Sequence, residues 1–552
     1  MTFNYREKTK IEYSVLELKQ VQSYLPLYKL LFKFKDEDFN KFELDSHHKV
    51  VKIIKRLDHN HIEVELNNGE IHQIFIKYSA LLDPIKYLIG KYNYSKELFT
   101  LPKLENKAHI KIMNPYNNAY IDGLFSYITS CLLHKYKFIH GLDFYGMNLA
   151  NQTDYRINIY DDFDYVCSSS EFIANIDKYF KLDYDLDILK PTKPKLTILD
   201  NIELNNIEVI NTKDITTKDI NTKDISLNLQ PLTGKNLETF TELSNAKLIT
   251  DNILLDNPSK TMHSSKNSNK SSSGSSCSSG SSCSSGCSSL LNDSDEESEE
   301  EPIYVHINNF PVNMICLEKC KDTLDNYMIH TDIEEEEWKG ILMQIIMMLL
   351  TYQKTLEFTH NDLHTNNVMY IETKKEFIYY HYNNVYYKVP TFNKLWKLID
   401  FGRAIYTIDG IRFASDSFFK NEDAYSQYNT EPFYEESKTR IEPNYSFDLC
   451  RLGCSLYDFF IDNPKEILDS LQSLISDWCH DDNGKNILYK KNGEERYPEF
   501  KLYKMIARLV HNHTPEKQLE RDLFKSYIIA KKKISKKASI MKINTFKIQV
   551  SQ

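Results

Sequence analysis

One loop in the second half of the chain combines side chains that could handle phosphate and magnesium. Residues 358–370 read FTHNDLHTNNVMY, so Asp362 follows His360 by two places and precedes Asn367 by five. A second carboxylate, Asp400, opens an Asp-Phe-Gly tripeptide further along. Carboxylate and amide oxygens are hard ligands of the kind that Mg²⁺ prefers. The same residue types also favour capped turns, so the loop alone is compatible with a magnesium site and with an ordinary polar turn.

The elements that must position these residues form a mixed pattern of strands and helices. Residues 49–77 contain apolar strand patterns separated by the turns DHNH and NNGE, which predicts three antiparallel strands. The third ends in IFIK, and its Lys77 either lies along a strand edge or offers its ammonium to an anion. The other expected elements are a helix over 117–134, a strand over 313–320, a long helix over 334–358, a hairpin over 377–389, a strand over 394–400 and a buried helix over 447–460.

Two parts of the chain depart from this pattern. Residues 10–34 have a helical apolar spacing, which predicts a helical N-terminal extension. From residue 147 the composition shifts, and a triple pentad, a serine-rich run and an acidic run follow. Segments so poor in apolar residues cannot offset chain entropy, so we expect 255–301 to be disordered. The acidic run is either a solvated tether or a tether phosphorylated at Ser294 or Ser298.

Composition limits the class of protein. The 552-residue chain is 41% hydrophobic, enough for a sizeable core, and its net charge of −10 argues against a chain that binds nucleic acid or a membrane surface along its whole length. No run of eighteen apolar residues and no apolar signal core occurs, so we expect a cytoplasmic protein without a membrane partner. The ten cysteines form no C-x-x-C pair and are expected to be reduced thiols.

The order of these features resembles the protein-kinase-like family. That family has an H-R-D-x-x-x-x-N catalytic loop followed by D-F-G, and this chain has HNDLHTNN followed by DFG. The resemblance implies an α+β, bilobal fold with a small β-rich N-lobe, a larger mainly α C-lobe and a long insertion. The implied parts are a helical extension (1–35), the N-lobe (36–146), the insertion (147–301), the last N-lobe strand and hinge (302–320), the C-lobe (321–530) and a basic tail (531–552).

The resemblance also implies roles for the loop residues, with ATP and Mg²⁺ as cofactors. Asp362 matches the catalytic Asp that accepts the proton of the substrate hydroxyl. Asn367 matches the amide ligand of a second Mg²⁺, and Asp400 matches the carboxylate that links metal to the β- and γ-phosphates. Phosphoryl transfer needs positioning and charge neutralisation more than covalent help, which suits this residue set.

Four further residues match the family's supporting positions. Lys77 matches the strand lysine that grips the α- and β-phosphates. Glu318 and Cys320 match the hinge positions whose backbone groups bind adenine. Asp448, in FDLCRLG, matches the helix Asp that braces the catalytic loop.

The sequence departs from the family pattern at three supporting positions. The turn DHNH holds no glycine, although the family's glycines let backbone N–H groups approach phosphate. The helix over 117–134 contains no Glu to pair with the strand lysine, and Asp122 is its only acid. Asn361 replaces the arginine of H-R-D, so we do not expect control by a phosphorylated activation segment.

Three functions remain open at this level. The first is a serine/threonine-protein kinase with a protein substrate, and the composition and low-complexity inserts are similar to those of kinase-like proteins of giant viruses or of AT-rich protists. The second is a pseudokinase that only binds. The third is a small-molecule kinase of the aminoglycoside or choline type, because His364 stands where Ser/Thr kinases usually carry Lys. The basic tail could touch anionic surfaces or simply fray in solution, and the oligomeric state is left open.

Overall fold

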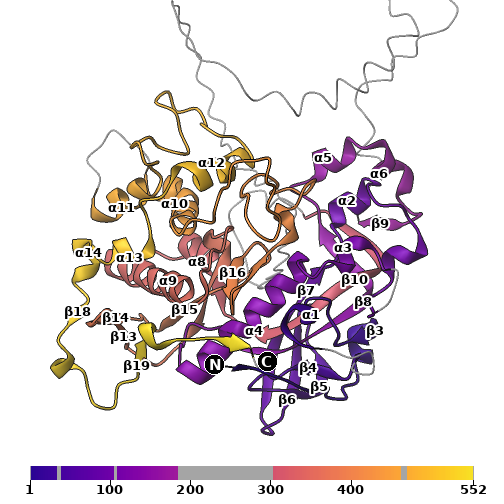
Figure 1. Cartoon of the computed structure of the whole chain (residues 1–552), viewed down its shortest axis with the longest axis horizontal. Coiled ribbons are helices and arrows are strands. Elements are labelled where there is room, and N and C mark those ends of the chain that lie inside the picture. The colour runs from indigo at the N-terminus through magenta and orange to yellow at the C-terminus, as the bar shows by residue number, and fades with distance from the viewer. Residues whose placement is uncertain (1, 34–38, 105–107, 184–301, 462–468, 551–552) are drawn as a thin grey trace, which may run out of the picture. The chain divides into compact units, whose positions relative to one another are not determined.

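The structure is a computed structural model, and it describes residues 2–33, 39–104, 108–183, 302–461 and 469–550 (Figure 1). These residues form a mixed α/β structure of several sheets and many helices, which agrees with the predicted α+β class. The segment 255–301, for which we predict disorder, lies outside the described residues, as do Ser294 and Ser298.

A seven-stranded antiparallel sheet dominates the N-terminal part of the chain. Its strands run in the order β3-β8-β10-β7-β6-β5, and β9 pairs with β10 beside this path. The strands are β3 (Leu18–Gln22), β5 (Val50–Arg56), β6 (His61–Leu66), β7 (Ile71–Ala80), β8 (Phe144–Asn158), β9 (Phe180–Asp183) and β10 (Tyr304–Glu318). The three strands predicted over 49–77 are therefore confirmed as β5, β6 and β7, and the strand predicted over 313–320 is the end of β10.

Helix α4 (Asn118–Tyr136) packs against this sheet and confirms the helix predicted over 117–134. The helix lies close to the strands because Gly123 has no side chain. A Cβ atom at that position would lie 2.6 Å from Sδ of Met147 and 3.0 Å from Nδ2 of Asn313. Asn313 also donates from Nδ2 to the carbonyl of Ala119 at 2.8 Å, which fixes the first turn of α4 against β10.

The predicted helical extension over 10–34 is wrong. Leu18–Gln22 forms β3, an outer strand that pairs with β8, and helix is limited to η1 (Ser14–Leu16) and α1 (Tyr28–Leu31). Pro26 precedes α1, and a proline removes the backbone donor that a continuous helix would need there. The apolar spacing instead reflects the burial of Leu25, Leu27 and Tyr28 in the main core.

The insertion does not begin at residue 147, as we expected, because β8 continues to Asn158 and pairs with β10 along its length. The misleading feature is the polar run in this strand, where Asn148, Asn151 and Gln152 are buried. Partners for these amides come from other segments: Asn148 donates to the hydroxyl of Tyr13, and Asn151 donates to a backbone carbonyl. The ordered sheet region therefore extends to Asp183 through α5 (Phe163–Cys167), α6 (Ser170–Asn175) and β9.

The part of the chain after β10 is mainly helical. The long helix predicted over 334–358 is α9 (Glu335–Leu356), and the helix predicted over 447–460 is α10 (Phe447–Phe460). The other helices of this part are α8 (Leu324–His330), α11 (Ser470–Trp478), α12 (Lys501–Leu509), α13 (Pro515–Gln518) and α14 (Asp522–Lys525), with the short turns η5 (Thr365–Asn367), η6 (Asp416–Phe418), η7 (Lys531–Lys533) and η8 (Ile543–Thr545).

Short helices also lie between β7 and α4, before β10. These are α2 (Pro84–Leu88), η3 (Lys96–Phe99) and α3 (Ile110–Met113).

Short sheets connect these helices. Strand β15 (Lys394–Leu398) confirms the strand predicted over 394–400, and it pairs with β12 (Val368–Glu372), which in turn pairs with β11 (Asp322–Thr323). The predicted hairpin consists of β13 (Phe377–Tyr382) and β14 (Val385–Pro390). The remaining short strands are β1 (Thr2–Phe3), β2 (Tyr5–Glu7), β4 (Phe42–Leu44), β16 (Ile405–Ile408), β17 (Ile411–Ala414), β18 (Ile528–Ile529), β19 (Ile540–Lys542) and β20 (Gln549–Val550).

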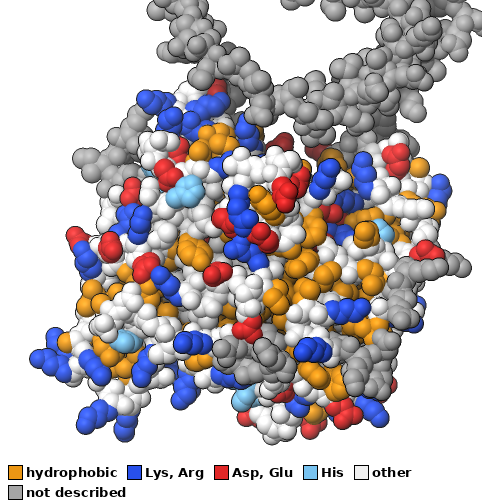
Figure 2. Space-filling model, viewed as in Figure 1, with side chains coloured by type: hydrophobic (Ala, Val, Ile, Leu, Met, Phe, Trp, Pro, Cys, Tyr) orange, Lys and Arg blue, Asp and Glu red, His pale blue; other side chains and the backbone are white. Residues whose placement is uncertain are grey.

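The C-terminal segment 531–550 is not a frayed tail. Strand β19 pairs in parallel with β13, β20 pairs in parallel with β1, and Met541 and Phe546 are buried. Its lysines face outward: Lys531, Lys532 and Lys533 are exposed, and Figure 2 shows basic side chains gathered at the lower left, where Figure 1 places β18 and β19. Within the described part of the chain, no helix has the length and apolar character needed to cross a membrane.

Candidate functional site

Lys77 lies between two carboxylates. Its Nζ atom lies 2.8 Å from Oδ2 of Asp122 on α4 and 2.8 Å from Oδ1 of Asp400 in the Asp-Phe-Gly tripeptide. The Lys77 side chain is 22% exposed, whereas that of Asp122 is 3% exposed. The structure thus brings together three residues that are far apart in the sequence, and Asp122 takes the place of the glutamate that the pattern lacked.

Asp122 also holds the backbone that follows Asp400. Its Oδ1 atom accepts a hydrogen bond from the backbone N–H of Phe401 at 3.0 Å. Burial raises the pKa of Asp122, the ammonium of Lys77 opposes that shift, and the nearby Asp400 adds to it. The carboxylate is therefore shared between a cation and a backbone donor, the combination that a buried charge requires.

The backbone at Asp400 is in the left-handed region, with φ of +60°. An aspartate tolerates this conformation better than most residues, although it remains uncommon. The next side chain, Phe401, is fully buried, and its ring contacts Phe125 at 4.6 Å and His360 at 5.6 Å between centroids. Packing of this ring fixes the turn that aims Asp400 at Lys77.

The loop that carries Asp362 is braced by Asp448, as the sequence predicts. Oδ2 of Asp448 accepts the backbone N–H of His360 at 2.9 Å, and Oδ1 accepts that of Asn361 at 2.9 Å. Asp448 lies in the first turn of α10 and is fully buried. Burial raises its pKa, and the two N–H groups together with His360 oppose that rise.

Asp362 is held by two residues that we did not foresee from the sequence. The hydroxyl of Tyr503 donates to Oδ1 at 2.9 Å, and Nε of Arg403 lies 3.7 Å from Oδ2. Burial raises the pKa of Asp362, but the cations Arg403 and Arg451 and the ring of His364 outweigh it and hold this pKa below its ordinary value. The only sequence signal was the position of Arg403 directly after Asp-Phe-Gly.

Asn367 lies at the end of η5 and is buried. Its Nδ2 atom donates to the carbonyl of Asp362 at 2.8 Å and approaches Nε2 of His364 at 3.1 Å. Among the residues that the structure describes, none donates a hydrogen bond to its amide oxygen. The side chain is thus fixed through its nitrogen, while its oxygen keeps a lone pair for a metal ion.

Asn361, which replaces an arginine of the pattern, connects the loop to the segment after Asp-Phe-Gly. Its Nδ2 donates to the carbonyl of Arg403 at 2.9 Å, and its Oδ1 accepts the hydroxyl of Tyr428 at 2.7 Å. Both contacts are buried, and Asn361 has a φ of +64°, a left-handed conformation that asparagine tolerates. A neutral amide therefore makes this connection without any phosphate.

The predicted hinge residues Glu318 and Cys320 lie at the end of β10 and just after it. The N–H of Glu318 donates to the carbonyl of Asp143 at 2.9 Å, and Oε1 of Glu318 accepts the N–H of Asp143 and pairs with Lys397. Cys320 follows the end of β10, and burial raises its pKa to about 12. The N–H of Glu318 is thus already engaged, and neither residue lines the pocket described next.

A pocket opens beside Lys77, Asp122 and Asp400. It holds about 810 Å³ of empty space, including open solvent at its mouth, and Gly402 and Arg403 also line it. Asp362 and Asn367 are not part of its lining. Lys77 and Asp400 thus border this pocket, whereas Asp362, the candidate base, does not. Arg403 lines the pocket and also lies beside Asp362.

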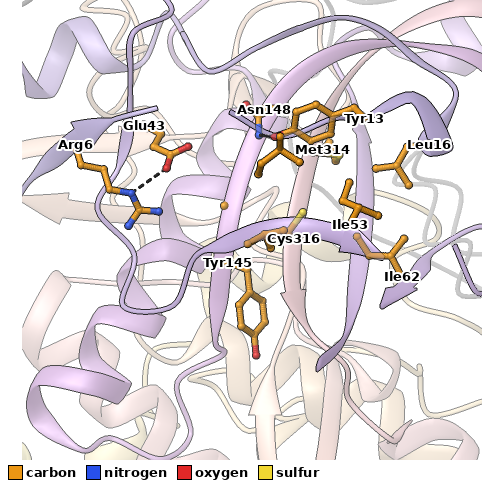
Figure 3. A pocket seen from close by; sticks show the side chains of 13 residues that line it. Arg6, Tyr13, Leu16, Glu43, Ile53, Ile62, Tyr145, Asn148, Met314 and Cys316 are labelled. Atoms are coloured by element: carbon orange, nitrogen blue, oxygen red, sulfur yellow. Dashed lines mark hydrogen bonds and ion pairs between the residues drawn. The ribbon is translucent and has the colours of Figure 1, made fainter. Parts of the chain in front are cut away.

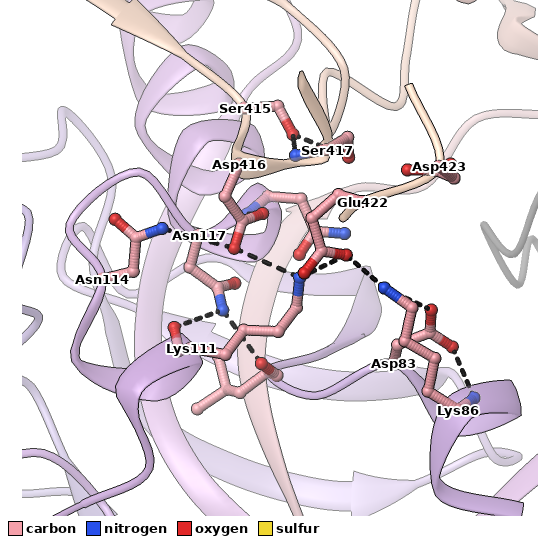
Figure 4. A network of polar contacts seen from close by, with 12 residues as sticks. Asp83, Lys86, Lys111, Asn114, Asn117, Ser415, Asp416, Ser417, Glu422 and Asp423 are labelled. Atoms are coloured by element: carbon pink, nitrogen blue, oxygen red, sulfur yellow. Dashed lines mark hydrogen bonds and ion pairs between the residues drawn. The ribbon is translucent and has the colours of Figure 1, made fainter. Parts of the chain in front are cut away.

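A second cluster of charges closes one side of this pocket (Figure 4). Nζ of Lys111 lies 3.2 Å from Oδ2 of Asp416 and 3.5 Å from Oε2 of Glu422, and Lys86 pairs with the same Glu422. Asp416 also accepts the backbone N–H of Asn118 at 3.0 Å, at the start of α4. We call Lys86, Lys111, Asp416 and Glu422 the carboxylate clamp; it fixes the segment after Asp-Phe-Gly to α2, α3 and α4.

A separate pocket lies on the other face of the main sheet (Figure 3). Tyr13, Met314 and Cys316 line it, and Arg6 pairs with Glu43 at 2.9 Å beside it. Side chains alternate between faces along a strand, and Cys316 is opposite Ile76 in the register, so this pocket is on the face away from Lys77. It therefore does not belong to the Lys77 site.

The glycine-free turn between β5 and β6 lies beside Lys77, because Asn60 exchanges hydrogen bonds with Ile76. In this turn, Oδ1 of Asp58 accepts the backbone N–H groups of Asn60 at 2.8 Å and of His61 at 2.9 Å. A carboxylate thus occupies donors that a glycine-rich loop would offer to phosphate.

No protein-family model matches this chain, and no curated protein matches it either.

Proposed function

We propose that this chain is an ATP-dependent phosphotransferase of the protein-kinase-like type, acting on serine or threonine hydroxyls of proteins. The observation that carries the proposal is the contact of Lys77 with both Asp122 and Asp400, beside a loop that presents Asp362 and Asn367 and is braced by Asp448. A bilobal arrangement is part of the proposal, with the main sheet and α4 as the smaller lobe and the helices after β10 as the larger one.

The donor set fits Mg²⁺ and a nucleotide. Asp400 offers a carboxylate and Asn367 an amide oxygen with no donor among the described residues, and both are hard oxygen ligands. Lys77 would bind the α- and β-phosphates, with Asp122 keeping its ammonium in place. When bound, Mg²⁺ neutralises the charge of the transferring phosphoryl group.

Asp362 would orient the acceptor hydroxyl and take its proton. Its pKa is held below the ordinary value, so the carboxylate is ionised at neutral pH and can accept a hydrogen bond from a hydroxyl. Tyr503 and Arg403 already contact its two oxygens, so an acceptor would share the carboxylate with them or displace one.

One observation favours the alternative of a pseudokinase. Asp58 occupies N–H groups of the turn beside Lys77 and places a negative charge there, which opposes the approach of phosphate. A pseudokinase that acts only as a binding module would not need these backbone N–H groups for phosphate. The alternative predicts weak nucleotide binding and no transfer.

Transfer of labelled γ-phosphoryl from ATP to a generic basic protein, with Mg²⁺, tests the proposal. We expect transfer by the wild-type chain and a loss of at least about 100-fold in Asp362→Asn and in Asp400→Asn, since each removes a charge from the reaction site. Asp332→Asn, an exposed aspartate between α8 and α9, is the matched control and should transfer as well as wild type.

Transfer by Asp362→Asn and Asp400→Asn at the wild-type rate would refute these roles. A folded wild-type chain without transfer to any acceptor would favour the pseudokinase instead.

A further inference from the structure

Three histidines gather at one end of α4, away from Lys77. His47 and His48 precede β5, and His134 lies in the last turn of α4. One ring nitrogen from each lies within 4.8 Å of the others. The rings of His47 and His134 stack at 4.0 Å between centroids, and the ring of His48 meets His134 edge-on at 5.1 Å.

The surroundings leave ring nitrogens of this cluster unused. Within the described ranges, no hydrogen bond from protein reaches the ring of His47 or His48, and that of His134 makes one, from Nε2 to Oδ1 of Asp143 at 2.8 Å. The side chains of His48 and His134 are 25% and 19% exposed, so an ion can enter while most of each ring stays packed. Three imidazoles with unused nitrogens form a ligand set for a borderline metal ion.

Asp143 supplies the carboxylate that usually accompanies such a set. Its Oδ2 atom lies 4.0 Å from Nε2 of His48, and its Oδ1 atom accepts from Ser130 at 2.9 Å as well as from His134. A carboxylate that receives the N–H of a ligating histidine fixes the ring and raises its basicity. Asp143 is itself buried, so its position is set before any ion arrives.

We propose that His47, His48 and His134, oriented by Asp143, form a binding site for one Zn²⁺ or a similar divalent transition-metal ion. Nitrogens at about 2.0–2.1 Å from a tetrahedral ion lie about 3.4 Å apart, so the rings must close by about 1 Å. Two of the three rings lie in the loop before β5, and the ring of His47 must rotate out of its stack on His134 so that its in-plane lone pair points at the ion.

Such a site would link the loop before β5 to the end of α4, which already contacts the start of β8 through the hydrogen bonds of Ser130 and His134 to Asp143. The Asp143 backbone pairs with Glu318 at the end of β10, through N–H groups that donate in both directions. An ion would therefore tie α4 and the start of β5 to the strand end that leads into the helical part of the chain. We expect it to act as a structural brace, independent of phosphotransfer.

Binding of Co²⁺ and Zn²⁺ to the metal-free full-length chain tests the site, by calorimetry and by the absorption of bound Co²⁺. We expect one ion per chain with a nitrogen-type Co²⁺ spectrum and a rise in melting temperature. His47→Gln should weaken binding at least about 10-fold, Asp143→Asn about 10- to 100-fold, and the double variant His48→Gln/His134→Gln should abolish it.

Two controls distinguish this site from other side chains of the protein that could bind a metal ion. His72→Gln removes a histidine whose side chain is 41% exposed and pairs with Glu70, and it should bind like wild type. Thiols outside the described residues, Cys277, Cys283 and Cys287, would give a thiolate-to-cobalt absorption that nitrogen ligands lack. The proposal is overturned if the wild-type chain binds no ion, or if the double variant binds with unchanged affinity and spectrum. His47 is exposed, so His47→Gln keeps the test valid even if the double variant fails to fold.

Discussion

Asp122 is one methylene shorter than a glutamate, and it nevertheless reaches Lys77 because Gly123 lets α4 lie close to the sheet. The sequence shows Asp122 as the one acid of this helix, but it does not reveal how near the helix lies to Lys77. Order and spacing select Lys77, Asp362, Asn367 and Asp400 as candidates, and their roles stay a prediction. Arg403 and Tyr503 were not, because their roles depend on how α12 and the Asp-Phe-Gly turn pack.

Two substitutions of Asp122 distinguish the effect of its negative charge beside Lys77 from the effect of its hydrogen bond with the backbone of Phe401. Asp122→Asn keeps an oxygen for the N–H of Phe401 but loses the negative charge beside Lys77, so we expect a folded chain with phosphotransfer reduced at least about 10-fold. Asp122→Ala loses both and should be less stable than Asp122→Asn by about 1–3 kcal/mol. Urea unfolding and transfer rates measure the two effects. Equal stability of the two variants would contradict the role of the backbone hydrogen bond.

His140 makes the stability of the fold dependent on pH. It is fully buried, its Nδ1–H donates to the carbonyl of Trp396 at 2.8 Å, and its Nε2 accepts the hydroxyl of Tyr380. Burial is the main cause that lowers its pKa from 6.5 to about 4. In the unfolded chain, the imidazole of His140 is therefore protonated below about pH 6.5, whereas in the folded chain it is protonated only below about pH 4. The free energy of unfolding therefore falls as the pH falls through this window.

The expected loss from His140 between about pH 7.5 and about pH 5 is about 2 kcal/mol. Urea unfolding at both pH values in wild type and His140→Gln isolates this contribution, because other groups affect both proteins alike. His72→Gln, at a histidine whose side chain is only partly buried, is the matched control and should keep the wild-type dependence. An identical pH dependence in His140→Gln and wild type would show that His140 is not the source.

At the scale of elements, strands with clear apolar alternation were predictable and strands with polar faces were not. The alternation over 49–77 predicts β5, β6 and β7 correctly. Our prediction starts the insertion at residue 147, inside strand β8, because the buried asparagines of this strand look like loop residues until their partners, such as Tyr13, are known. The same holds for β3, whose strand conformation depends on its pairing with β8.

The carboxylate clamp should be a main contributor to the position of the segment after Asp-Phe-Gly. Burial alone would lower the pKa of Lys111, but Asp416 and Glu422 hold it above its ordinary value, so the lysine stays charged at neutral pH. Lys111→Met leaves Asp416 buried without its cation, and we expect a loss of about 3–5 kcal/mol in unfolding free energy. Faster proteolysis of residues 416–430 should accompany it.

Two variants check this interpretation of the clamp. Lys490→Met breaks an exposed pair with Glu494 on a surface turn and should leave urea unfolding unchanged. The double variant Lys111→Met/Asp416→Asn removes the unpaired charge and should recover part of the stability that Lys111→Met loses. If Lys111→Met unfolds at the same urea concentration as wild type, the clamp does not stabilise the segment.

At the scale of the whole molecule, the α+β class was predictable, whereas the path of the chain ends was not. A lysine-rich composition suggested a frayed tail, but the apolar residues between the lysines are buried. The pairing of β20 with β1 and of β19 with β13 depends on strands more than 150 residues away, and no local pattern predicts such partners.

The C-terminal segment should therefore contribute to stability. Phe546 is 6% exposed, and its ring lies 4.9 Å from that of Tyr136 and 5.8 Å from that of Phe138. We expect Phe546→Ala to cost about 3–5 kcal/mol in unfolding free energy. Phe459→Ala, at a side chain that is 47% exposed, is the control and should cost clearly less. Equal effects of the two substitutions would mean that the segment is not packed as described.

The proposed phosphate site is tested most directly by binding of a non-hydrolysable ATP analogue to the full-length chain, with and without Mg²⁺. The account predicts that Mg²⁺ strengthens binding by at least about 10-fold in wild type and in Asp332→Asn. It also predicts that Asp400→Asn loses this dependence and that Lys77→Met binds weakly in either condition. Absence of binding by the folded wild-type chain, or equal affinities in all four proteins, would contradict the assignment of Lys77, Asp122 and Asp400 to a magnesium-nucleotide site.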